Sequence, residues 1–231
     1  MSANVIARPD RFVFTVLFAA ALVLGIAGFA PTYFLKYWFE TPPLTLRVHI
    51  HALLFTAWLC LLLYQSVLIR TRNYATHARL GKAALLIVAL MVITGFMVVL
   101  QKPRPTEAAR AFIFTPLLSL VLFPLFVAAA IRFRRDAATH KRLMWLATML
   151  FMGAPLTRLL VMAGVQLTPY LNHLVTYLLL LVPLLVYDLW RYRRLHPATL
   201  WGGLMLLVRH PIHEWIAFSP EWQRLAAALT G

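Results

Sequence analysis

Residues 70–82 read Arg70-Thr-Arg-Asn-Tyr-Ala-Thr-His-Ala-Arg-Leu-Gly-Lys82, a short basic connection between two long apolar segments. Sixty-three residues after its histidine, a partial copy reads Arg135-Asp-Ala-Ala-Thr-His-Lys-Arg-Leu143 and also leads into a long apolar segment. Aligned on the histidines, the two stretches share Arg at −5, Ala at −2, Thr at −1, Arg at +2 and Leu at +3. Basic turns between apolar segments are typical of a chain that crosses a membrane several times.

The composition agrees with this interpretation. Hydrophobic residues make up 62% of the 231 residues, and the mean hydropathy is +0.78. Soluble domains hold about 45–50% apolar residues. Here the excess is concentrated in segments of about 20 residues, the length a helix needs to cross a hydrocarbon core of ~30 Å. We therefore predict an all-α, polytopic membrane bundle.

Six transmembrane helices are predicted, over residues 12–35, 48–69, 83–100, 111–131, 143–165 and 171–190. They form one transmembrane domain, 12–190, after a short cytoplasmic leader, 1–11. The first apolar segment is too long for a cleaved signal peptide, so we expect it to remain as an anchor. In the tail, 191–231, the apolar segment 198–208 has only 11 residues, too few to span. We therefore predict interfacial helices on the cytoplasmic side at the C-terminus.

The distribution of charge predicts the orientation. The formal net charge is +15, and sixteen Lys and Arg lie in the leader, two connections and the tail, against five in the three alternate connections. The positive-inside rule then places both termini in the cytoplasm of a bacterial inner (plasma) membrane. This pattern requires no nucleic acid; the expected partners of the cations are anionic lipid headgroups on the cytoplasmic side.

Few catalytic classes have support in the sequence. The single cysteine, Cys60, excludes an intrachain disulfide, and the sequence supports neither a cysteine-based metal site nor a thiol nucleophile. There is no phosphate-binding Gly-rich loop, no Gly-x-Ser-x-Gly and no His-Glu-x-x-His pattern. Whether the protein is an enzyme is left open.

Four histidines lie in two layers of the predicted bundle. His51 and His173 begin helices on the outer side, and His77 and His140 begin helices on the cytoplasmic side. Two pairs near opposite faces suit a two-haem electron carrier, in which neutral imidazoles bind iron axially. We therefore predict these four as cofactor ligands, with haem b as the first candidate and another metal as the second. Histidines near helix ends also suit hydrogen bonding to headgroups and water, and this alternative stays open.

Further polar groups accompany the histidines. Arg158 lies inside the fifth predicted span, where an ionisable group is costly. It either extends to the outer headgroups or holds an anionic group, such as a haem propionate or a lipid phosphate. The expected polar neighbours of the histidines, from helical spacing and from the repeated stretch, are Trp58, Gln65, Tyr177, Arg79 and Arg142.

The repeated stretch has two explanations that the sequence does not separate. The second and third spans recur as the fourth and fifth through an ancient duplication, or both basic helix starts arose by convergence. Their charge either sets the topology alone or also binds an anion at a helix N-terminus.

Several motifs have the spacing of a known family. They are His51 followed by Gln65, then His77-Ala-Arg-Leu-Gly81, then Arg135-Asp136 with His140-Lys-Arg-Leu-Met144, then Arg158. From His51 to about Trp190 the chain resembles a family of bacterial polytopic membrane proteins of unknown function. It departs from that pattern at Ala78, where a basic residue is usual, and at 52–55, which lack a glycine. The resemblance implies a six-helix type of bundle, groups His51, His77, His140 and Arg158 as a set, and implies no activity.

Three functions follow as hypotheses. The first is a cofactor-binding redox protein or redox accessory with Arg158 as the counter-charge. The second is a non-enzymatic subunit or assembly factor of a membrane complex. The third is an enzyme or carrier for anionic lipids or isoprenoid phosphates.

Overall fold

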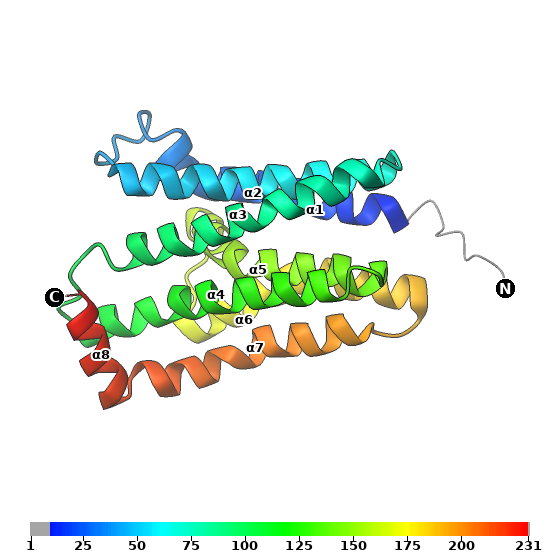
Figure 1. Ribbon diagram of the computed structural model, residues 1–231. Coiled ribbons are helices and arrows are strands. Elements are labelled where there is room, and N and C mark those ends of the chain that lie inside the picture. The colour runs from blue at the N-terminus through cyan, green and yellow to red at the C-terminus, as the bar shows by residue number, and fades with distance from the viewer. Residues whose placement is uncertain (1–9, 231) are drawn as a thin grey trace.

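The computed structural model describes residues 10–230, which are almost entirely helical (Figure 1). Residues 1–9 of the predicted leader lie outside the described residues. The elements in chain order are α1 (Asp10–Phe29), the π-helix η1 (Ala30–Phe34), α2 (Leu46–Arg70), α3 (Tyr74–Val99), α4 (Glu107–Arg132), α5 (Ala137–Met162), α6 (Pro169–Tyr192), α7 (Pro197–Ala217) and α8 (Pro220–Thr230).

Six of these helices are long and apolar enough to cross a membrane: α1 continued by η1, and α2 to α6. This confirms the predicted all-α polytopic bundle. Helices α3 and α5 begin at residues 74 and 137, earlier than the predicted spans at 83 and 143. The sequence predicts the basic turns as loops, whereas most of each is the first part of a helix. His77 and His140 are therefore each the fourth residue of a helix rather than residues outside it.

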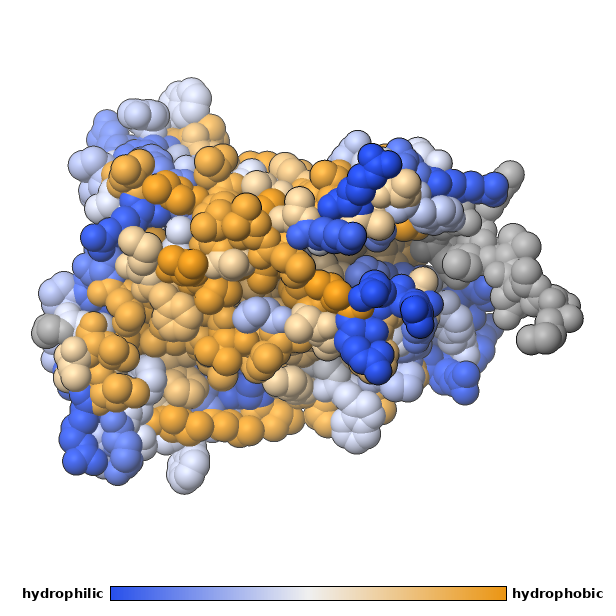
Figure 2. Space-filling model, viewed as in Figure 1, coloured by the Kyte–Doolittle hydropathy of each residue, from blue (hydrophilic) through white to orange (hydrophobic). Residues whose placement is uncertain are grey.

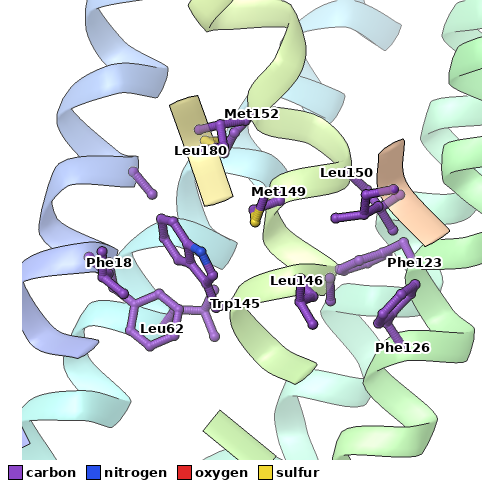
Figure 3. Packing of buried hydrophobic residues seen from close by; sticks show 14 of the residues in the cluster. Phe18, Leu62, Phe123, Phe126, Trp145, Leu146, Met149, Leu150, Met152 and Leu180 are labelled. Carbon is purple, nitrogen blue, oxygen red and sulfur yellow. The ribbon is translucent and has the colours of Figure 1, made fainter. Parts of the chain in front are cut away.

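Helix α5 is the centre of the bundle and packs against α1, α4, α6 and α7. Trp145, Leu146 and Met149 of α5 are buried in the main apolar cluster, to which α1 contributes Phe18 and α4 contributes Phe123 (Figure 3). Interdigitated side chains of this kind give the dispersion contacts on which helix association in lipid depends. The face of the molecule seen in Figure 2 has a broad apolar region between two polar ends.

A close approach joins α1 to α5. A Cβ atom added at Gly28 would lie 2.4–2.5 Å from atoms of Pro155, so a larger residue would push the two helices apart. Small residues allow this kind of backbone contact between membrane helices.

The bundle has two chemically different ends. We call the end that holds the start of α1, the α2–α3 turn, the α4–α5 turn and the α6–α7 turn the basic end. The opposite end holds the 35–45 loop, the 100–106 loop and the 163–168 loop. The turns of the basic end carry Arg72, Arg134, Arg135, Arg193 and Arg194.

The predicted position of the C-terminal tail was wrong. Helix α7 has 21 residues, about 31 Å at ~1.5 Å per residue, and packs against α4, α5 and α6 instead of lying on the basic end. Helix α8 lies at the opposite end, where the indole N–H of Trp222 donates to the carbonyl of Arg110 at 2.9 Å. The two described ends of the chain thus lie at opposite ends of the bundle (Figure 1).

The reason for the error is the polarity of the second half of α7. Arg209 and His213 lower the mean hydropathy of α7, which is not among the six helices that are apolar enough to cross a membrane by composition. Both side chains are nevertheless buried within the bundle. Two of the sixteen cations that the sequence assigns to the basic side therefore lie elsewhere, Arg209 inside the bundle and Arg224 at the opposite end.

Candidate functional site

The basic end brings together two helix starts with the same local structure. Asn73 precedes α3, and its side-chain oxygen accepts the backbone N–H of Thr76 at 3.2 Å. Asp136 precedes α5, and its carboxylate accepts the N–H groups of Ala138 at 3.0 Å and Thr139 at 3.3 Å. Such caps satisfy backbone donors that a helix start leaves unpaired. The histidine follows each cap by four residues, so both imidazoles project from the first turn.

His77 and His140 face each other across the bundle. Their ring centroids are 6.4 Å apart and their planes are nearly perpendicular, at 82°. The Nδ1 atom of His140 lies 2.8 Å from the carbonyl oxygen of Ala130, at the end of α4. Because a carbonyl only accepts, Nδ1 must carry a proton, so in the neutral form of the ring Nε2 of His140 has the lone pair. This part of the predicted ligand set is brought together.

Gln65 lies beside the same pair. Its amide nitrogen donates to the backbone carbonyl of His77 at 3.2 Å, so the predicted neighbour is in contact. The amide oxygen of Gln65 and Nδ1 of His77 are buried without a hydrogen-bond partner in the part of the chain that the structure describes. Unpaired buried polar atoms cost about 1–3 kcal/mol each. The site therefore contains polar atoms whose hydrogen-bonding capacity the described residues do not use.

The two arginines that follow the histidines differ. Arg79 is exposed. Arg142 is fully buried and forms an ion pair with Asp188, which is also fully buried. The Nε of Arg142 donates to the carboxylate at 3.1 Å, and one of its terminal nitrogens donates to the carbonyl of Ala138 at 2.8 Å. Asp188 also accepts the backbone N–H of His196 at 3.0 Å. The pair thus ties α5, α6 and the start of α7 together.

The predicted outer histidine pair is not formed. His51 lies 3.2 Å from the hydroxyl of Thr94 on α3, and its ring packs on Phe55. His173 lies 3.2 Å from the carbonyl of Leu206 on α7, and its ring packs on Tyr177. Over the described residues α2 and α6 do not pack against each other, because α1 and α5 lie between them. The two histidines were predicted at one level of the bundle, but a shared level does not make two helices neighbours.

Arg158 does not face the histidines either. It is exposed, donates to the hydroxyl of Thr32 at 3.2 Å, and lies 4.8 Å from the ring centroid of Phe29. These contacts lie near the opposite end and match a guanidinium that extends toward headgroups. Arg158 therefore lies away from His77 and His140, at the other end of the bundle.

The remaining predicted neighbours have packing roles. Trp58 is buried edge-on against Phe123, with ring centroids 5.1 Å apart. Tyr177 donates its hydroxyl proton to the carbonyl of Leu150 at 3.2 Å and accepts a hydrogen bond from Arg209.

Arg209 lies in the segment predicted as an interfacial tail, and the sequence did not single it out as a functional residue. Its side chain is buried, donates to the hydroxyl of Ser119 at 3.0 Å, and stacks 4.7 Å from the ring centroid of Tyr177. No carboxylate among the described residues forms an ion pair with it. The gap beside it, lined also by His173 and His213, is too narrow for a water molecule. An arginine directly after an apolar segment was the available signal for this buried cation.

Comparisons of the chain with protein-family models, curated proteins and solved structures gave no match. The family resemblance noted from the motifs therefore stays a prediction.

Proposed function

We propose that this integral membrane protein binds one redox cofactor through His77 and His140 at the basic end. Haem b is the first candidate for this cofactor. The separation of their ring centroids, 6.4 Å, carries the proposal. Metal–imidazole bonds are about 2.0–2.1 Å long, so two imidazoles on opposite sides of one ion have ring centres roughly 6–6.5 Å apart. The distance between these two rings therefore already suits a shared iron.

The surroundings of the pair support a haem over a bare metal ion. Among the described residues, no three or more His, Cys, Asp and Glu side chains are grouped to hold an ion. A haem iron takes only two axial ligands from the protein. The hydrogen bond from His140 to the Ala130 carbonyl fixes the ring and its tautomer, as the partners of metal-bound histidines do. The cations of the basic end provide partners for the propionates.

A single centre near one end changes the expected role. In the described residues His51 and His173 do not form the outer pair that a second cofactor in the same arrangement needs. We propose that electrons enter and leave the site from the basic end, as in a redox accessory protein or a redox sensor.

The experiment is a spectrum and a metal analysis of the protein purified in detergent from haem-replete cells. We expect about one haem per chain, with the reduced spectrum of a six-coordinate, bis-histidine iron. His77→Ala and His140→Ala should each lose the bound haem. His49→Ala is the matched control, because His49 is exposed at the opposite end. A colourless, metal-free preparation that takes up no added haem would contradict the proposal.

The low burial of α3 favours a second candidate, a subunit or assembly factor of a membrane complex. Only 17% of the 18-residue apolar stretch of α3 is buried within the chain, compared with 50% of the corresponding stretch of α4. A membrane helix with so little intrachain packing offers a face to another helix as readily as to lipid. Isolation in a mild detergent tests this function: co-purifying subunits in stoichiometric amounts support it, and a chain that migrates alone counts against it.

A further inference from the structure

A cavity of about 380 Å³ opens at the opposite end of the bundle. It is lined by Tyr33, Phe34, Lys36, Tyr37, Pro43, Leu44 and His49. Its volume lies in the range of small-molecule sites, about 300–1,000 Å³. It is far from the histidine pair, because η1 and the start of α2 form the end opposite to the α2–α3 turn.

Irregular backbone builds this cavity. Helix α1 changes into the π-helix η1, and π-helical turns are rare and often found at functional sites. The guanidinium of Arg158 holds η1 from outside through the hydroxyl of Thr32. In the following turn Glu40 has a φ of 49°, a left-handed conformation that is uncommon for a residue other than glycine. The loop is tied to the neighbouring connection by the hydroxyl of Thr45, which donates to Gln101 at 3.3 Å.

The cavity provides hydrogen-bond donors and positive charge. The ammonium of Lys36 donates to the carbonyl of Pro42 at 3.1 Å, which leaves further protons for a ligand. His49 lies 3.4 Å from the hydroxyl of Tyr33, a long contact that a bound acceptor can replace. None of the lining residues is acidic. A ligand that complements this wall carries negative charge and several acceptor oxygens.

The position of the cavity indicates that this ligand comes from the membrane. It lies where the apolar spans Phe12–Phe34 and Leu46–Arg70 meet the 35–45 loop, which is the level of the lipid headgroups. Tyr37 and Trp38 beside it are 88% and 79% exposed, as aromatic residues of the interfacial zone are. Phe34, Pro43 and Leu44 give part of the wall an apolar surface that suits the glycerol and upper acyl region of a lipid.

We propose that this cavity binds the phosphate headgroup of an anionic phospholipid, with Lys36 as its charged partner and His49 and Tyr33 as hydrogen-bonding partners. The site is independent of the histidine site at the basic end. It would anchor a specific lipid against α1 and α2.

The test is native mass spectrometry of the full chain in detergent with added phosphatidylglycerol or phosphatidylcholine. We expect the anionic lipid to be retained about tenfold better than the zwitterionic one. Lys36→Ala should abolish this preference, and Lys36→Arg should keep most of it. Arg47→Ala is the control, since Arg47 is an exposed cation of the same end that does not line the cavity.

Two results would overturn the proposal. An equal loss for Lys36→Ala and Arg47→Ala would mean that diffuse charge attracts the lipid. Chemical acetylation of Lys36 provides the second readout, followed by peptide mass spectrometry of the wild-type chain. Protection by phosphatidylglycerol but not by inorganic phosphate supports a lipid; equal protection by phosphate alone contradicts the lipid as the ligand.

Discussion

Helices α3 and α5 begin with the same arrangement of cap, threonine and histidine, yet the arginine two residues after the histidine has opposite surroundings. Arg79 is exposed, whereas Arg142 is fully buried against Asp188. The local sequence fixes the start of each helix and the direction of its histidine. The neighbours of each helix decide what the arginine does, because α5 is the central helix and α3 lies at the margin of the bundle.

This difference separates two uses of the same residues. At α3 the arginine is a solvated charge of the basic end. At α5 it is part of an ion pair that holds three helices and is flanked by the rings of Tyr187 and Tyr192, at 5.3 and 5.4 Å. The two histidines, in contrast, retain equivalent positions and meet. The histidines, which have equivalent positions in both helix starts, therefore form the candidate site. The ion pair of Arg142 with Asp188, which only α5 has, is the structural anchor.

The largest effect is expected when the anchor is broken. Asp188→Ala leaves the guanidinium of Arg142 buried without a counter-charge, which typically costs about 3–5 kcal/mol. The free energy of unfolding in detergent, from thermal or chemical denaturation, measures this loss. Arg79→Ala is the matched control at the equivalent position and should change stability by less than about 0.5 kcal/mol.

A double variant distinguishes an unpaired charge from lost packing. Arg142→Met with Asp188→Leu removes both charges and keeps apolar volume, so it should recover most of the stability lost in Asp188→Ala. If the double variant is as unstable as the single one, the anchor acts through its hydrogen bonds to Ala138 and His196 rather than through charge.

The two caps should show a smaller and unequal effect. Asp136→Ala removes two backbone hydrogen bonds and a 2.5 Å hydrogen bond from the hydroxyl of Thr139, whereas Asn73→Ala removes one backbone hydrogen bond. Loss of a cap costs about 0.5–2 kcal/mol, so we expect Asp136→Ala near the upper part of this range and Asn73→Ala near the lower part. Equal losses in the same unfolding measurement would show that the second backbone contact of Asp136 adds nothing.

The repetition in the sequence predicted more about this end than the hydropathy did. The periodic apolar segments were enough for the six spans, and the repeated Thr-His pattern singled out the two histidines that meet. The cap residue four positions before each histidine was a further signal, because Asn73 and Asp136 both favour a helix start. Using it would have placed the starts of α3 and α5 near residues 74 and 137, where the structure has them.

Contacts between distant helices could not be predicted in this way. Arg142 and Asp188 are 46 positions apart, and nothing in either segment specifies the other. The expected pairing of His51 with His173 failed for the same reason, since helix order in a bundle is set by packing. Helix α7 was missed because Arg209 finds its hydrogen-bond partners, Ser119 and Tyr177, on α4 and α6 inside the protein. Hydropathy scales instead assume that a polar residue is exposed to its solvent.

A weaker difference concerns the helix that precedes each turn. Gln65 of α2 donates to the carbonyl of His77, but the equivalent residue of α4, Ala128, is exposed, and His140 instead contacts the carbonyl of Ala130. Gln65→Ala removes one hydrogen bond and also one unpaired buried oxygen, so the two terms partly cancel. We expect a loss of less than about 1 kcal/mol.

Ser66→Ala is a suitable control for that variant, because its hydroxyl bonds only to Leu63 within the same helix. A loss for Gln65→Ala well above the stated value would show that this side chain does more for the α2–α3 pair than its single hydrogen bond indicates. Its effect on haem retention can be read in the same preparation.

The smallest effect is a dependence on pH that only the α5 start should show. The hydroxyl of Thr139 holds the pKa of Asp136 below its usual range, and two backbone N–H groups act in the same direction. A carboxyl whose folded-state pKa is depressed stabilises the fold above its unfolded pKa of about 3.9, and this contribution is lost as the pH falls through the folded value. Asn73 does not titrate, so the α3 start is unaffected. Because Asp136 is mostly exposed, solvent screening keeps the contribution small.

Unfolding midpoints of wild type and Asp136→Asn, measured in detergent from pH 7 to 3, should differ slightly at pH 7 and converge below about pH 4. A difference that stays constant over this range would mean that the carboxylate charge at the cap has no role, and that Asp136 and Asn73 are equivalent caps.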